Sequence, residues 1–189
     1  MGGVFERDEF PDAFPGRVAD EGHVDAGAMR KLVVFGGPPC TGKSTVGRAL
    51  GHAHLEMDEA RVRLLPEAAH TRADRAIAYR AVLWTAVHLL RYTDIVICNG
   101  GVGHAEDRAG CEDVAAEAGA RLLVVEFTAP LDVLLERNRA RRAHHPGLDL
   151  TDERVTEIVE TYPWWGRGIL VDSTRPEAEC VETVRRYLA

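Results

Sequence analysis

Short apolar runs alternate with longer segments in which apolar residues recur every three or four positions. Runs rich in β-branched and large apolar residues are typical of strands buried in a sheet. These runs cover residues 31–35, 94–98, 121–127 and 169–171, and a shorter strand is predicted at 54–57. Between 75 and 92, residues such as Ile77, Val82 and Ala86 follow helical spacing. The alternation predicts an α/β fold, a parallel sheet covered by helices on both faces.

Residue types at the ends of these segments sharpen the helix predictions. Gly51 and Gly119 stand where helices commonly stop, and Pro130 suits a first helical turn. Thr151 is a favoured cap for a helix that ends near Pro163. The expected helices are therefore 43–50, 59–65, 75–92, 105–118, 130–143, 151–163 and a closing helix that Pro176 opens.

The first predicted strand leads directly into a glycine-rich motif. Residues 37–45, which we call the phosphate loop, fit the pattern Gly-x-x-x-x-Gly-Lys-[Ser/Thr] without a mismatch and precede a helix. Such a loop turns its backbone N–H groups inward to bind phosphate, Lys43 adds a positive charge, and Ser44 offers a hydroxyl to Mg²⁺. The predicted nucleotide-binding residues are Gly37, Pro38, Pro39, Cys40, Thr41, Gly42, Lys43, Ser44 and Thr45.

Two polar residues follow other strands at the same edge of the predicted sheet. Asp58 comes after the strand at 54–57 and Asn99 after the strand at 94–98. Ligands of such sheets bind beyond the carboxyl ends of the strands. A carboxylate at position 58 can take the proton of a substrate hydroxyl that attacks a phosphoryl group; the alternative is a helix cap. Arg61 can hold an anion of the substrate or Asp58 itself, or it is an exposed helix residue.

Four arginines gather near the end of the helix after the strand at 121–127. Arg137 and Arg141 are four positions apart and so share a face of that helix. Such arginines can neutralise charge on a transferring phosphoryl group. The alternative is favourable charge at a helix C-terminus.

Taken together, these motifs resemble the small P-loop kinases, a group that includes chloramphenicol phosphotransferase-like, zeta-toxin-like and polynucleotide-kinase-like proteins. The resemblance covers about residues 30–175. It implies a three-layer P-loop NTPase sandwich with a five-stranded parallel sheet and a short lid that contains Arg137. It also implies ATP with Mg²⁺, Asp58 as the base, and transfer of the γ-phosphate to a hydroxyl group.

Asn99 departs from this pattern, because the corresponding strand of P-loop proteins commonly ends in an acid. A neutral amide is a weaker metal partner, so Mg²⁺ is expected to depend on Ser44 and Asp58. The other interpretation is that Asn99 binds the acceptor.

Composition narrows the class of acceptor and the cellular compartment. Residues 1–28 hold seven acids and two arginines, a net charge of −5, which leaves −2 for the rest of a chain of net charge −7. We interpret 1–28 as an acidic extension, partly disordered or docked, and 29–189 as the kinase domain. The absence of a basic excess argues against nucleic acid. Four widely separated cysteines favour reduced thiols in a cytoplasm, and no apolar run is long enough for a membrane helix.

These observations lead to one main function and two alternatives. The main expectation is an ATP-dependent kinase that phosphorylates a hydroxyl of a small molecule such as an antibiotic, a nucleoside or a sugar derivative; a homo-oligomer is compatible with the sequence. The alternatives are a polynucleotide 5′-hydroxyl kinase and a nucleotide-dependent regulator. The segment Tyr162-Pro-Trp-Trp165 either stacks on a flat substrate or packs a helix against the sheet.

Overall fold

A computed structural model describes residues 29–67, 71–100, 102–142 and 150–189. Its sheet holds five parallel strands in the order β2-β3-β1-β4-β5. The strands are β1 (Lys31–Gly36), β2 (Ala53–Glu56), β3 (Ile95–Asn99), β4 (Arg121–Thr128) and β5 (Ile169–Asp172). The predicted fold class is confirmed. The predicted extension, residues 1–28, lies outside the described residues.

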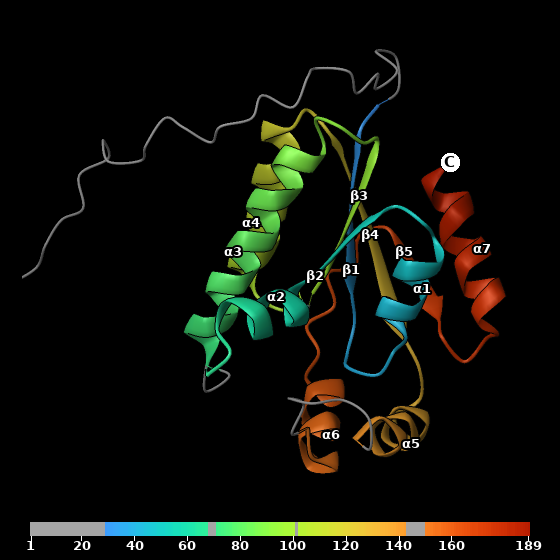
Figure 1. The fold of residues 1–189 in the computed structure, drawn as a ribbon. Helices are drawn as coiled ribbons and strands as arrows, with labels where there is room; N and C mark the ends of the chain where they lie inside the picture. Colours follow the sequence, from blue (N-terminus) through green and yellow to red (C-terminus); the bar gives the residue numbers. More distant parts are fainter. Residues whose placement is uncertain (1–28, 68–70, 101, 143–149) are drawn as a thin grey trace, which may run out of the picture.

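Helices cover both faces of the sheet and one of its ends (Figure 1). The helices are α1 (Lys43–Ala49), α2 (Met57–Leu64), α3 (Arg72–Leu89), α4 (Ala105–Glu117), α5 (Leu131–Arg142), α6 (Asp152–Glu160) and α7 (Glu177–Leu188). In Figure 1, α3 and α4 lie on one side of the sheet, α1 and α7 on the other, and α5 and α6 beyond the strand ends. No helix within the described ranges is long and apolar enough to span a membrane.

The alternating side chains of β1 explain why the sheet is covered twice. Leu32 and Val34 belong to one hydrophobic cluster, with α3 and α4, whereas Val33 and Phe35 belong to the other, with α1 and α7. Successive side chains of a strand point to opposite faces, and all four are fully buried. The central strand is thereby held on both sides, which fixes the position of the loop that follows it.

The strand register brings polar residues together at the carboxyl edge of the sheet. Glu56 of β2 is paired with Asn99 of β3, which is paired with Phe35 of β1. On the other side of β1, Gly36 is paired with Glu126 of β4. Because parallel strands end at the same edge, these residues surround the start of the phosphate loop.

The helix starts agree with the predicted cap at Thr151 and differ at α2. Thr151 caps α6, and its hydroxyl accepts a hydrogen bond from the Arg154 amide, as predicted. Helix α2 begins earlier than expected, at Met57, with Glu56 in the cap position. Asp58 therefore lies inside the first turn of α2, and the interpretation of Asp58 as the helix cap is wrong.

Candidate functional site

The phosphate loop keeps the backbone shape that its glycines allow. Gly37 has a φ of 127° and Gly42 a φ of 79°, both in the left-handed range that L side chains disfavour. A Cβ atom at Gly37 would lie 2.4 Å from the carbonyl oxygen of Phe127, so β4 passes directly beside the loop. Cys40 adopts a φ of 64° without being glycine. The Thr41 hydroxyl closes the turn by donating to the carbonyl of Pro38 at 2.9 Å.

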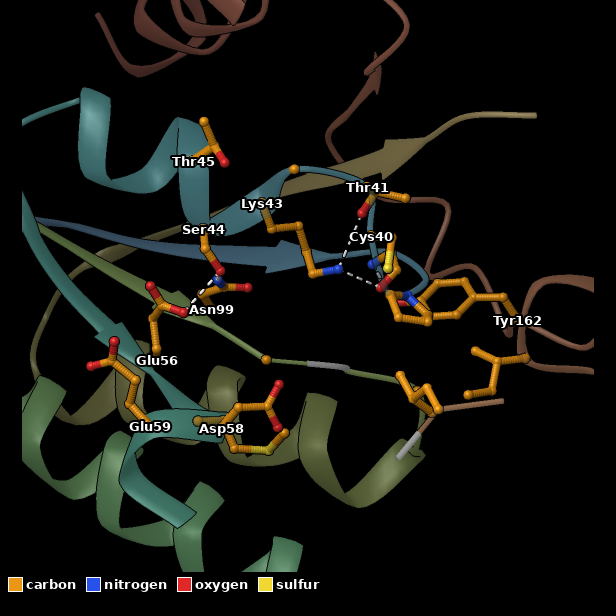
Figure 2. A pocket seen from close by; sticks show the side chains of 18 of the residues that line it. Cys40, Thr41, Lys43, Ser44, Thr45, Glu56, Asp58, Glu59, Asn99 and Tyr162 are labelled. Atoms are coloured by element: carbon orange, nitrogen blue, oxygen red, sulfur yellow. Dashed lines mark hydrogen bonds between the residues drawn. The ribbon is translucent and has the colours of Figure 1, made fainter. Parts of the chain in front are cut away.

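The side chain of Lys43 extends back into the turn formed by the preceding residues of the phosphate loop (Figure 2). Its ammonium group donates to the carbonyl oxygens of Gly37 at 2.9 Å and Pro38 at 2.7 Å, and to the Thr41 hydroxyl at 3.1 Å. Burial lowers the pKa of Lys43 from 10.5 to about 8, and the charge of Asp58 offsets part of that effect. The ammonium is therefore easier to deprotonate than that of an exposed lysine.

The hydroxyl of Ser44 joins two residues from neighbouring strands. It donates to the Glu56 carboxylate at 2.8 Å and accepts from the side-chain amide of Asn99 at 2.9 Å. Arg48 also pairs with Glu56, at 2.5 Å. Asn99 thus contacts the predicted metal-binding hydroxyl, and the acid beside that hydroxyl is Glu56 of β2 rather than Asp58.

Mg²⁺ prefers hard oxygen ligands, and the residues around the Ser44 hydroxyl offer such oxygens. Ser44 provides a hydroxyl oxygen and Glu56 a carboxylate, and Asn99 joins this hydrogen-bonded set through its amide nitrogen. Among the described residues, no group of three histidines, cysteines or acids is arranged so that it could hold a metal ion on its own. The donor set therefore suits Mg²⁺ that is shared with nucleotide phosphates, which usually complete the coordination of this ion.

A cavity of about 1160 Å³ runs from the phosphate loop to the space between α2 and α3. Of the predicted nucleotide-binding residues, all but Pro38 line it, and Pro38 contributes its carbonyl to Lys43. Asp58 and Arg61 line it from α2 and Asn99 from β3. Figure 2 shows the carboxyl group of Asp58 directed into the cavity from the side opposite the phosphate loop.

The two predicted arginines of α5 both reach this cavity. Arg137 donates to the carbonyl of Cys40 at 3.4 Å, and to the hydroxyl and carbonyl of Ser173 at 3.1 and 2.6 Å. It therefore ties α5 and the residue after β5 to the phosphate loop. Arg141 lies near enough to Lys43 for its charge to contribute to the lowered pKa of that lysine.

The aromatic segment Tyr162-Pro-Trp-Trp165 was expected either to stack on a substrate or to pack a helix against the sheet, and its residues differ in this respect. Tyr162 lines the cavity, and its hydroxyl accepts a hydrogen bond from the Gly37 amide at 2.5 Å. Trp165 packs, partly buried, against the cluster that holds α3 and α4. Trp164 is 40% exposed and contacts the ring of Tyr162 edge to face. The segment does not simply pack one helix on the sheet.

Glu126 and Arg108 hold this segment and were not predicted to do so. The buried Glu126 carboxylate accepts hydrogen bonds from the amides of Trp165 at 2.8 Å and Gly166 at 2.9 Å. Arg108 donates to the carbonyls of Val102 and Pro163. A signal for Glu126 was present in the sequence, because an acid inside an apolar strand needs hydrogen-bond partners.

Three solved structures share this architecture. A gluconokinase from Sinorhizobium meliloti 1021 is 22% identical over 85% of this chain and 92% of its own, with a TM-score of 0.63. The APS kinase of Mycobacterium tuberculosis, in complex with AMPPNP and APS, is 23% identical over 85% and 98%, with a TM-score of 0.63. Shikimate kinase from Acinetobacter baumannii, in complex with shikimate, is 16% identical over 85% and 91%, with a TM-score of 0.57.

These likenesses establish that the fold is that of the small P-loop kinases. A comparison with curated proteins finds no match. A family model does match more than half of the chain, from residue 32 to residue 163, and includes the phosphate loop, Glu56, Asp58 and Tyr162. The chain therefore belongs to the AAA domain family that this model describes.

Proposed function

We propose that this protein transfers the γ-phosphate of ATP to a hydroxyl group of a small molecule. The observation that carries the proposal is the position of Asp58 in the cavity. Its carboxyl group faces the space that begins at the phosphate loop, and its charge acts on the Lys43 ammonium. A carboxylate on the far side of a phosphate-binding loop suits a base for an attacking hydroxyl.

The nucleotide half of the site is assigned to the phosphate loop and the arginines of α5. The loop amides and Lys43 bind the β- and γ-phosphates, and Arg137 and Arg141 neutralise charge on the group in transfer. Ser44 and Glu56 would hold Mg²⁺, with Asn99 orienting the Ser44 hydroxyl, and the ion would draw charge from the phosphate oxygens. One structural neighbour was solved in complex with AMPPNP, which supports nucleotide binding by a chain of this fold.

The acceptor half of the site lies between α2, α3 and the start of α4. Arg61 and Arg75 line it together with Asp58, and Arg61 is only 3% exposed. Arg72 is held there by the two carboxylate oxygens of Asp107 at 3.2 Å. An excess of arginine beside the base favours an acceptor with an anionic group in addition to its hydroxyl.

Incubation with γ-labelled ATP and a panel of hydroxylated metabolites and antibiotics tests the proposal. Mass spectrometry should detect one added phosphate on at least one acceptor, and Lys43→Ala should abolish it while the variant stays folded. Oligonucleotides belong in the panel, because their labelling would favour the polynucleotide kinase alternative. Slow ATP hydrolysis with no labelled acceptor would favour a nucleotide-dependent regulator and contradict the proposal.

A further inference from the structure

The hydroxyl of Tyr162 holds an unusual position beside the phosphate loop. It accepts a hydrogen bond from the Gly37 amide at 2.5 Å. A phenol carries one O–H donor in addition to its acceptor lone pairs, so the proton of Tyr162 remains available. No described residue accepts that proton, although the hydroxyl lies at the wall of the cavity.

Contacts from two elements, β4 and α4, hold the segment that carries the tyrosine. Glu126 of β4 holds the next residues through the amides of Trp165 and Gly166. Arg108 of α4 donates to the Pro163 carbonyl and lies over the Trp165 ring, 5.6 Å from its centroid. Because Glu126 is buried in the sheet and Arg108 belongs to a packed helix, Tyr162 keeps its position without a ligand.

Glycine at position 36 allows the close approach of this side chain. A Cβ atom there would lie 3.3 Å from the Tyr162 hydroxyl oxygen and 3.1 Å from a methyl group of Val102. The end of β1 is thus shaped around the phenol. Burial also raises the pKa of Tyr162, so the phenol stays protonated, and able to donate, at neutral pH.

Gly37 connects the tyrosine to the lysine that serves the phosphates. Its carbonyl accepts from the Lys43 ammonium at 2.9 Å, and its amide donates to Tyr162. Figure 2 shows the hydroxyl end of Tyr162 directed at the loop, near the end of the Lys43 side chain. In phosphate loops, the lysine contacts the outer phosphates. The free proton of Tyr162 therefore faces the region of the terminal phosphate rather than that of the nucleoside.

We infer that Tyr162 is a catalytic residue whose O–H donates a hydrogen bond to the terminal phosphoryl group of the bound nucleotide. The inference rests on the proposed function. It assigns the tyrosine a contact that only a triphosphate provides, so Tyr162 distinguishes ATP from ADP. Trp164 supports the ring from its outer side, with the two ring centroids 4.8 Å apart.

Binding measurements with AMP-PNP and ADP, each with Mg²⁺, test this contact without a known acceptor. Tyr162→Phe keeps the ring and loses only the hydroxyl. It should weaken AMP-PNP binding by about 10- to 150-fold, the range for a hydrogen bond to a charged group, and leave ADP binding unchanged. Tyr92→Phe is the matched control, because Tyr92 is exposed and does not line the cavity, and it should leave both affinities unchanged. Equal weakening of both nucleotides, or no effect, would overturn the inference.

A second measurement uses the unaltered protein. With ¹³C-labelled tyrosine, the Cζ resonance of Tyr162 should shift on addition of AMP-PNP and not on addition of ADP, because only the former offers the phosphate acceptor. An identical response to both nucleotides would contradict the contact. If the unaltered protein binds neither nucleotide, the proposed function itself fails, which is a result distinct from an unchanged Tyr162→Phe variant.

Discussion

The hydroxyl of Ser44 donates a hydrogen bond to the carboxylate of Glu56 at 2.8 Å, across the gap between α1 and β2. This contact places an acid beside the hydroxyl that phosphate loops offer to Mg²⁺. We therefore expect Glu56→Gln to raise the Mg²⁺ concentration needed for half-maximal ATP turnover by about 10-fold, which a Mg²⁺ titration measures. Glu59→Gln is the control, since that residue is exposed and pairs only at 3.5 Å with Arg48. An unchanged Mg²⁺ requirement in Glu56→Gln would remove Glu56 from the metal position.

The role of Asp58 can be separated from nucleotide binding. Asp58→Asn keeps the size of the side chain and removes its capacity to take a proton. We expect phosphate transfer to fall by about 10²- to 10⁴-fold, the usual contribution of a general base, while AMP-PNP binds with unchanged affinity. Single-turnover transfer from labelled ATP measures the first quantity and calorimetry the second. Near-normal transfer by Asp58→Asn would mean that another group accepts the proton.

The lowered pKa of Lys43 predicts a pH dependence of nucleotide binding. In the free protein this pKa is about 8, so the ammonium loses its proton as the pH rises through that value. Bound phosphates favour the charged form and raise the pKa, so binding takes up a proton around and above pH 8, and affinity decreases there. Calorimetry in buffers of different ionisation enthalpy should detect proton uptake at about pH 8.5 and much less at about pH 6.5.

Lys43→Met serves as the control for this measurement. The variant should bind nucleotide more weakly and show no proton uptake in the same pH range. Uptake that persists in Lys43→Met would assign the proton to another group.

The arginines between α2 and α3 predict a preference for acidic acceptors. An aldonic acid and its neutral aldose form a suitable pair, because they differ mainly in the charged group. We expect the acid to have the higher kcat/KM and Arg75→Gln to reduce that preference by about 10-fold, with an unchanged KM for ATP. Arg80→Gln, on the exposed side of α3, is the control. Equal use of both sugars by the unaltered protein would contradict an anion-binding acceptor site.

The buried carboxylate of Glu126 predicts an effect on stability. A glutamine in its place keeps one acceptor oxygen and presents an NH₂ group to the other backbone amide. Loss of a charged hydrogen bond in a buried place should lower the free energy of unfolding by about 1–3 kcal/mol. Urea denaturation measures this quantity. Glu112→Gln, whose partner Arg167 is exposed, should change it by under about 1 kcal/mol.

The parts of the site that could be predicted from the sequence are those encoded in adjacent residues. The phosphate loop is one such part, because the strand, the glycines and the helix follow each other directly. The fold class followed from alternating apolar periods for the same reason. The sequence predicts Asp58 as the residue after the second strand, whereas the strand ends at Glu56 and a helix begins at Met57. An uncertainty of two residues in a boundary was enough to pass over Glu56.

Contacts between distant residues could not be predicted in this way. Gly37 and Tyr162 are separated by 125 positions, and nothing in the local sequence of either indicates the other. The same holds for Arg137 and Ser173, which meet because α5 and the end of β5 lie at one edge of the sheet. These pairs depend on strand order, and the order of five parallel strands is decided by packing of whole helices.

The hydrogen bonds from Lys43 to the carbonyls of its own loop also affect the kinetics of nucleotide exchange. Because the ammonium and the loop backbone are already arranged, an incoming nucleotide does not have to order this segment and loses little conformational entropy there. The phosphate loop should keep the same conformation with and without bound nucleotide. The rate at which product leaves is then set by other parts of the molecule, such as the arginines that reach the cavity from α5.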